Sequence, residues 1–134
     1  MKFARIVFLV AGIYGLIVVA PQYFLETRIG RDTPPPITHP EFFYGFVGVT
    51  VAWQILFLVL SRDPVRYRAM MLVGIVEKIG FPIAVAVLYA QNRVPPTVVV
   101  AASIDLVLGV LFLIAYLKTS EPAKSVDACG DLNF

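Results

Sequence analysis

Three ionisable side chains interrupt long apolar stretches of this sequence, and they are its strongest candidates for chemistry. Glu77 and Lys78 lie in one stretch and Asp105 lies in another. An ionisable residue inside a membrane-spanning segment is by default a candidate functional residue. Each charge costs about 2.5–3.5 kcal/mol at the centre of an inserted helix. Two carboxyls and one ammonium are suited to binding a cation, carrying a proton or holding the polar part of an amphipathic molecule.

These charges are expected to point into the protein and to pair there. Glu77 and Lys78 are adjacent, so their side chains diverge by about 100° around a helix and make a poor pair. Lys78 is better matched by Asp105 on another helix. That pairing would leave Glu77 facing Gln54, Tyr14 or a water-filled pocket.

Other polar and aromatic residues are expected at a similar depth. At ~1.5 Å per residue, Glu77 and Asp105 each lie ~12 Å from the start of their helices, close to the bilayer midplane. Residues from the two other helices lie within one or two turns of that depth. We therefore predict a ligand- or proton-binding site formed by Glu77, Lys78, Asp105, Gln54, Trp53 and Tyr14.

A structural explanation of the charges is the main alternative. Interhelical polar contacts in membranes contribute only about 0.6 kcal/mol on average, so three charges are a costly way to join helices. The charges could instead pair with a helix of another subunit. Trp53 lies in mid-helix rather than at an interface, and it fits packing as well as ligand stacking.

Four apolar stretches supply the helices that would position these residues. Hydrophobic residues make up 59% of the 134-residue chain, against about 45–50% in soluble domains. A hydrocarbon core about 30 Å thick needs roughly 20 apolar residues per helix. The predicted fold is all-α, one domain over residues 1–118 folded as a four-transmembrane-helix up-down bundle, with helices at about residues 4–25, 41–60, 69–90 and 97–117. A polar loop with three consecutive prolines joins the first two helices, and a polar tail covers residues 119–134.

The distribution of lysine and arginine predicts the orientation of the chain. One side carries seven basic residues, namely Lys2, Arg5, Arg62, Arg66, Arg68, Lys118 and Lys124. The other side carries three, namely Arg28, Arg31 and Arg93. By the positive-inside rule both termini are cytoplasmic, in a multi-pass protein of the bacterial inner (plasma) membrane. The first helix is expected to be retained, because Pro21 would block cleavage of a signal peptide after Ala20.

The arginines of the second loop have a second interpretation. The positive-inside rule is enough to explain Arg62, Arg66 and Arg68. The same three side chains could bind anionic lipid head groups.

Several other classes of function are not suggested by the sequence. The net charge of +2 is too small to indicate nucleic acid. One histidine and one cysteine, Cys129, give no metal-ligand set and no internal disulfide. No cofactor motif is present, and no catalytic set can be assigned, so an enzyme is less expected than a binding protein.

Four short helices, buried acids on the third and fourth, and the run from Leu108 to Phe112 resemble the small bacterial four-helix membrane proteins of the DoxX-like type. The resemblance is architectural and spans roughly residues 6–118. It implies a four-helix membrane bundle and carries over no functional residues.

The leading functional hypothesis is binding or translocation of a small amphipathic molecule, an ion or a proton at the midplane. A structural or assembly subunit of a larger membrane complex is the first alternative. A lipid-modifying membrane enzyme with a buried carboxyl as its acid or base is the second. The expected partners are membrane lipids, a small amphipathic ligand, and a membrane protein or a second copy of the chain.

Overall fold

The computed structural model describes residues 2–119, and four long helices account for most of them. They are α1 (Lys2–Val19), α3 (Pro40–Arg62), α4 (Arg68–Ala90) and α5 (Pro96–Lys118). A 3₁₀ segment, η1 (Ala20–Phe24), continues α1, and a short helix, α2 (Glu26–Asp32), follows it. The fold is all-α, as predicted, and α3, α4 and α5 begin and end within two residues of the predicted ranges. The predicted first helix, 4–25, ends as an α-helix at Val19 and is continued to Phe24 by η1. The predicted tail, apart from Thr119, lies outside the described residues, as does Cys129.

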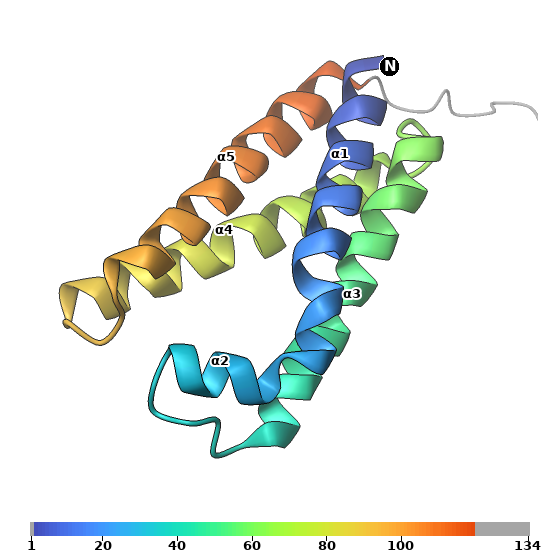
Figure 1. Ribbon diagram of the computed structural model, residues 1–134. Helices are drawn as coiled ribbons and strands as arrows, with labels where there is room; N and C mark the ends of the chain where they lie inside the picture. Colours follow the sequence, from blue (N-terminus) through green and yellow to red (C-terminus); the bar gives the residue numbers. More distant parts are fainter. Residues whose placement is uncertain (1, 120–134) are drawn as a thin grey trace, which may run out of the picture.

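The long helices pack as two antiparallel pairs. The first hairpin is α1 with α3, and the second hairpin is α4 with α5. The hairpins contact one another less extensively, chiefly through α1 and α5. Figure 1 shows them meeting near the N-terminus and diverging toward α2 and the α4–α5 turn. We call the meeting end, with Lys2, the α3–α4 turn and Lys118, the terminal end, and the opposite end the α2 end.

All four helices are long and apolar enough to cross a membrane. Large apolar side chains are exposed along each of them, Ile17, Val49, Val76 and Leu117 among them. Such surfaces are favourable in lipid, where every backbone polar group of a helix is satisfied internally. The protein is therefore an integral membrane protein with four candidate spans.

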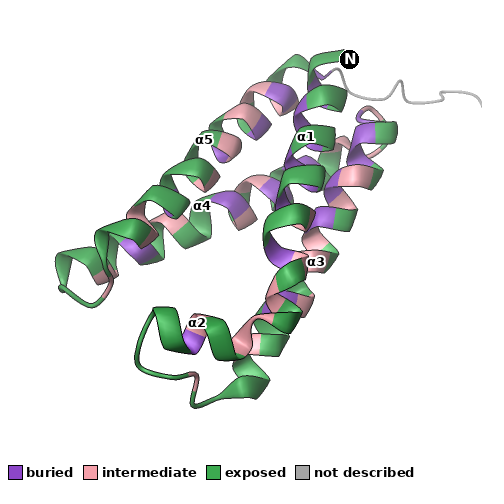
Figure 2. Ribbon diagram, in the orientation of Figure 1, coloured by how far each residue is buried: buried purple, intermediate pink, exposed green. Residues whose placement is uncertain are grey.

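An aromatic cluster joins the two hairpins at the terminal end. The rings of Phe8 and Phe112 lie 4.3 Å apart between centroids, and those of Phe57 and Phe112 lie 4.9 Å apart. All three side chains are fully buried. Smaller residues and two longer aliphatic ones complete this core, namely Ala4, Val7, Ala11, Leu60, Met71 and Ala115. Figure 2 shows that buried positions occur mainly where the hairpins meet, so the core occupies one half of the bundle.

Glycines allow close approach within the first hairpin. A Cβ added at Gly12 would meet the Leu58 side chain and the Gln54 carbonyl, and one added at Gly15 would collide with the Gln54 side chain. Small residues at a helix crossing let backbones come close, which is how membrane helices gain packing energy. The α1–α3 contact is thus specified by Gly12 and Gly15.

The segment between α1 and α3 is more ordered than the sequence suggested. A polar loop was expected, but its first half forms α2, which is bounded by Leu25 and Thr33. The Tyr44 hydroxyl donates a 2.7 Å hydrogen bond to Oε2 of Glu26, and the Tyr23 and Tyr44 rings stack with centroids 6.1 Å apart. These contacts fix η1 and α2 to the start of α3. Periodicity could not indicate a helix of only seven residues.

Candidate functional site

Lys78 is the centre of a charged triad formed with Glu77 and Asp105. Its ammonium nitrogen lies 3.1 Å from Oδ1 of Asp105 and 3.3 Å from Oε2 of Glu77. The exposed fractions of these side chains are 6% for Lys78, 17% for Glu77 and 24% for Asp105. The Lys78–Asp105 pair expected from the sequence is confirmed. The adjacent Glu77 also reaches the ammonium, by longer contacts than Asp105 makes.

Packing of α4 against α5 sets the position of the triad. A Cβ built at Gly109 would lie 3.4 Å from Cβ of Lys78, so the base of Lys78 rests on Gly109. Asp105 is four residues before Gly109, one turn along the same helix, which brings its carboxylate to the end of the lysine side chain. The missing side chain at Gly109 therefore makes room for this ion pair.

The triad has more acceptor capacity than donor capacity. Lys78 donates hydrogen bonds to Oδ1 of Asp105 at 3.1 Å and to Oε1 of Glu77 at 3.4 Å. Oε2 of Glu77 is buried and accepts no hydrogen bond among the described residues, although the ammonium lies 3.3 Å away at an unfavourable angle. With both carboxyls ionised, the triad carries a net charge of −1. It can accept one further cation or proton.

Asp105 belongs to a stripe of residues on one face of α5, which begins at the aromatic core. Ala101, Asp105, Leu108 and Phe112 follow one another at spacings of four, three and four residues, and so share a face of the helix. Phe112 is fully buried, Leu108 and Asp105 are half-buried, and Ala101 is exposed. Exposure therefore rises along the stripe from the terminal end toward the α2 end.

A stripe on α3 has the same spacing and runs in the same direction. It consists of Phe46, Thr50, Trp53 and Phe57. Phe57 is fully buried, Trp53 and Thr50 are half-buried, and Phe46 is 56% exposed. Because Phe57 contacts Phe112, the two stripes start together at the core and separate beyond it. We call the space between them the wedge.

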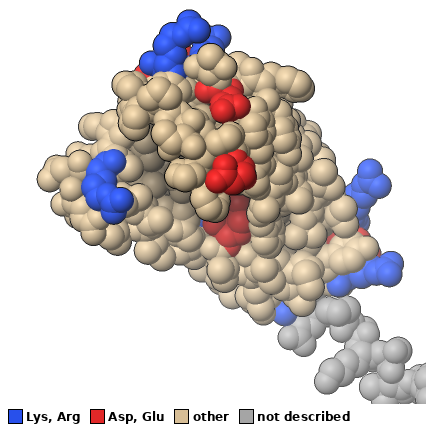
Figure 3. Space-filling model, turned by 90° about the horizontal axis from the view of Figure 1, so that it is seen from below, with Lys and Arg blue, Asp and Glu red and all other residues tan. Residues whose placement is uncertain are grey.

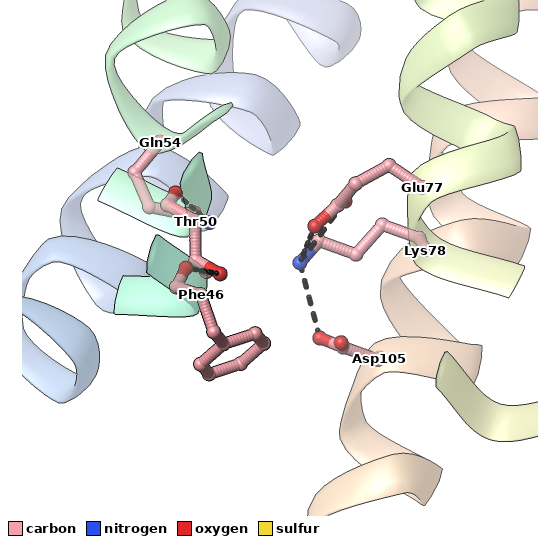
Figure 4. Close-up of polar contacts among 6 residues, drawn as sticks. All are labelled: Phe46, Thr50, Gln54, Glu77, Lys78 and Asp105. Atoms are coloured by element: carbon pink, nitrogen blue, oxygen red, sulfur yellow. Dashed lines mark hydrogen bonds and ion pairs between the residues drawn. The ribbon is translucent and has the colours of Figure 1, made fainter. Parts of the chain in front are cut away.

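Figure 4 shows the two walls of the wedge near the triad. Glu77 and Lys78 project from α4 toward the first hairpin, and the ring of Phe46 projects from α3 toward the second. The Thr50 hydroxyl donates to the carbonyl of Phe46 at 2.8 Å and leaves its oxygen as an acceptor. Thr50 and Asp105 are each seven residues before a core phenylalanine, so they lie at similar depths.

The core forms the closed floor of the wedge. The ammonium of Lys78 lies 5.5 Å from the centroid of the Phe57 ring. Figure 3 views the molecule from the α2 end: several acidic side chains lie in a row near the middle of this face, and lysine and arginine side chains lie at its margins. The carboxylates of the triad are partly exposed, and the contacts among the rings of Phe8, Phe57 and Phe112 close the terminal end of the wedge.

Gln54 belongs to a different contact from the one expected. Its amide nitrogen donates to the carbonyl of Thr50 at 3.2 Å, and its side chain packs against Gly15 of α1. It is 1% exposed, and its Oε1 has no hydrogen-bond partner within the described part of the chain. Gln54 lies on the face of α3 beside the stripe, so it contributes to the α1–α3 crossing rather than facing Glu77.

Tyr14 and Trp53 lie in different surroundings. Tyr14 is seven residues after Val7, on the same side of α1, but it is 39% exposed where Val7 is buried. Trp53 packs on the core, with its ring 6.2 Å from that of Phe57. Trp53 therefore forms a wall of the wedge close to its floor.

The three loop arginines lie at the terminal end, in different environments. Arg62 and Arg66 are exposed, and the Arg66 guanidinium lies 5.6 Å from the Tyr67 ring. Nε of Arg68 donates to the carbonyl of Thr119 at 2.7 Å, and its guanidinium lies 4.0 Å from the Tyr116 ring. Arg68 thus joins α4 to the end of α5, while Arg62 and Arg66 present their charges outward.

Sequence reasoning missed Phe46, Thr50 and Phe81. Phe46 and Thr50 continue the stripe of Trp53, and Phe81 is one turn beyond Glu77 on α4. The spacing of four, three and four residues, which α3 and α5 share, was the signal that could have identified the first two.

No protein-family model matches the chain, and no curated protein or solved structure matches it either.

Proposed function

We propose that this integral membrane protein binds a small amphipathic molecule whose positively charged part is held by Glu77 and Asp105. The observation that carries the proposal is the triad itself. Two carboxylates share one nearly buried ammonium, Lys78, and the wedge leaves both carboxylates partly accessible. A net charge of −1 in a low-dielectric site attracts a cation strongly. Inorganic cations and protons are simpler occupants of the same site.

The apolar walls favour an amphipathic ligand over a simple ion. Trp53, Phe46 and Leu108 surround the approach to the triad with apolar area. Binding sites for small molecules are mainly apolar with a few polar groups that fix orientation. The wedge has this composition, and its aromatic rings offer faces that attract cations.

We further propose that the terminal end faces the cytoplasm and the α2 end faces outward, in a bacterial inner membrane. Among residues 2–119, Lys2, Arg5, Arg62, Arg66, Arg68 and Lys118 belong to the terminal end. Arg28, Arg31 and Arg93 belong to the α2 end. The positive-inside rule then gives the wedge an outward opening. The architecture resembles that of the small DoxX-like membrane proteins, and the exposed Arg62 and Arg66, with Arg68 beside them, are suited to contact anionic lipid head groups.

The binding proposal is tested with three probes that share an octyl chain: octylammonium, octanol and octanoate. The protein is placed in phosphatidylcholine vesicles at pH 7, and binding is followed by the fluorescence of Trp53, the single tryptophan of the chain. Octylammonium is expected to give a saturable change that octanol and octanoate do not give. Equal responses to all three probes, or none, would overturn the proposal.

Variants then assign the binding to the triad. Glu77→Gln with Asp105→Asn removes both negative charges and is expected to weaken octylammonium binding at least tenfold. Glu41→Gln is the matched control, because Glu41 is a carboxylate at the α2 end with 65% of its side chain exposed. The control is expected to bind as the wild type does.

An assembly subunit is a second candidate, favoured by the exposed apolar side chains on the walls of the wedge. Phe46 is 56% exposed and Phe81 is 40% exposed, and a helix of a partner or of a second copy would cover them. Light scattering of the purified protein in detergent separates the candidates. In a Cys129→Ala background, a monomer in which Phe46→Cys reacts readily with maleimide supports the open wedge. An oligomer that protects this cysteine supports assembly.

A further inference from the structure

The hydrogen bonding of the Glu77 carboxylate bears on which cations the site prefers. Oε2 of Glu77 is buried and has no hydrogen-bond partner among residues 2–119. An ionised carboxylate only accepts hydrogen bonds, and a buried acceptor without a donor is unfavourable. The Lys78 ammonium forms an ion pair with this oxygen at 3.3 Å, while its hydrogen bonds go to Asp105 and to Oε1 of Glu77. A ligand that carries an N–H group as well as a positive charge can donate a hydrogen bond to the partly exposed Glu77 carboxylate as well as neutralise it.

The position of Lys78 indicates from which side the N–H group of a ligand approaches Glu77. Its ammonium lies above Phe57, next to the floor. The floor itself is closed by the contacts of Phe8, Phe57 and Phe112. Exposure of the α3 and α5 stripes rises toward the α2 end, so the charged group of a ligand is expected to enter first from that side, with its apolar part trailing toward that end.

Apolar side chains occupy the position that the trailing part would take. Phe81 is four residues beyond Glu77 toward the α2 end, on the same face of α4, and it is 40% exposed. Phe46 is four residues beyond Thr50 on the facing wall. About 14 Å separates the depth of Asp105 from the start of α5 at Pro96, at 1.5 Å per residue. A compact apolar group or a short chain matches that length.

We propose that the ligand is a protonated primary, secondary or tertiary amine, bound with its N–H toward Glu77 and its apolar part between Phe46 and Phe81. This inference rests on the proposed function and narrows its ligand to one chemical class. An ammonium with an N–H forms a charge-assisted hydrogen bond to the carboxylate, and the added charge makes the triad neutral. A quaternary ammonium brings the same charge without a donor.

Two probes that differ by one methyl group test the inference. N,N-dimethyloctylammonium carries one N–H at pH 7, and N,N,N-trimethyloctylammonium carries none. Both are titrated into wild-type protein in phosphatidylcholine vesicles, with Trp53 fluorescence as the readout. The dimethyl probe is expected to bind at least tenfold more tightly than the trimethyl probe. Binding of the two with equal affinity would overturn the inference while leaving the proposed cation site standing.

Two variants locate the hydrogen bond and the apolar contact. In Glu77→Gln the preference for the dimethyl probe is expected to fall below twofold, whereas the Glu41→Gln control keeps it. Phe81→Ala is expected to weaken the binding of both probes severalfold and by equal factors. It removes apolar contact and leaves the hydrogen bond between the probe's N–H and Glu77 in place. A preference that survives in Glu77→Gln would assign the donor contact elsewhere and overturn the role given to Glu77. If octylammonium itself shows no saturable binding, the proposed function fails together with this inference. If the two probes merely bind equally well, only this inference fails.

Discussion

Lys78 and Asp105 are 27 residues apart in the chain, and they meet at 3.1 Å across the α4–α5 interface. The contact links the two helices of the second hairpin at the depth where the first hairpin has begun to diverge. It therefore has two roles, since it holds α4 against α5 and keeps a carboxylate at the wedge.

Removing Lys78 is expected to destabilise the protein strongly. In Lys78→Met the carboxylates of Glu77 and Asp105 lose their shared counter-charge, and breaking a buried ion pair typically costs about 3–5 kcal/mol. The triple variant with Glu77→Gln and Asp105→Asn added should recover much of that loss, because no unpaired charge remains. Thermal unfolding in detergent measures both, with Lys118→Met as the control at an exposed position. A triple variant no more stable than Lys78→Met would contradict the pairing argument.

The Gly15–Gln54 contact predicts a steric defect that can be rescued. Gly15→Ala places a Cβ against the Gln54 side chain, and overpacking of this kind typically costs about 1–3 kcal/mol. Gln54→Ala added to Gly15→Ala should restore most of the stability. Gly80→Ala is the matched control, since nothing lies within 4 Å of an added Cβ there. Thermal unfolding in detergent compares these three variants with the wild type, and equal stabilities of Gly15→Ala and Gly80→Ala would contradict the proposed contact.

The aromatic core should respond to truncation far more than the exposed rings do. Phe57→Ala removes the ring that contacts Phe8, Phe112 and Trp53. Loss of a buried phenylalanine typically costs about 3–5 kcal/mol. Phe42→Ala, at a position 73% exposed, should have little effect. Unfolding measured by Trp53 fluorescence checks the difference, and similar effects of the two changes would argue against a core at the terminal end.

The proposed orientation predicts opposite labelling of two engineered cysteines. In a Cys129→Ala background, Thr33→Cys at the α2 end should react with a membrane-impermeant maleimide in intact cells. Val65→Cys in the α3–α4 turn should react only after the membrane is permeabilised. The reverse pattern would place the wedge opening on the cytoplasmic side and would invert the direction from which a ligand enters.

The sequence predicted the four helices and the Lys78–Asp105 pair for simple physical reasons. Twenty or so apolar residues have few alternatives to a helix in a bilayer, and an isolated charge in lipid requires a partner. The same reasoning underestimated Glu77. A flexible lysine side chain can reach its sequence neighbour even though the two residues leave the helix in different directions.

The divergence of the hairpins and the placement of Gln54 could not be predicted in the same way. The four long helices are apolar on every side, so polarity does not separate the faces that meet protein from those that meet lipid. Gln54 and Trp53 are adjacent, and only the packing of Gly15 shows that Gln54 turns to α1. Helix α2 was missed because its seven residues, with one large apolar side chain at Ile29, give no periodic pattern.

The aromatic core has a consequence for the bilayer around the protein. Because the hairpins are joined at the terminal end and apart at the α2 end, the molecule takes up unequal cross-sectional areas in the two leaflets. Lipid chains or a bound ligand must fill the difference on the α2 side. The lateral pressure of that leaflet then acts on the angle between the hairpins. Membrane curvature and ligand binding should therefore both change this angle.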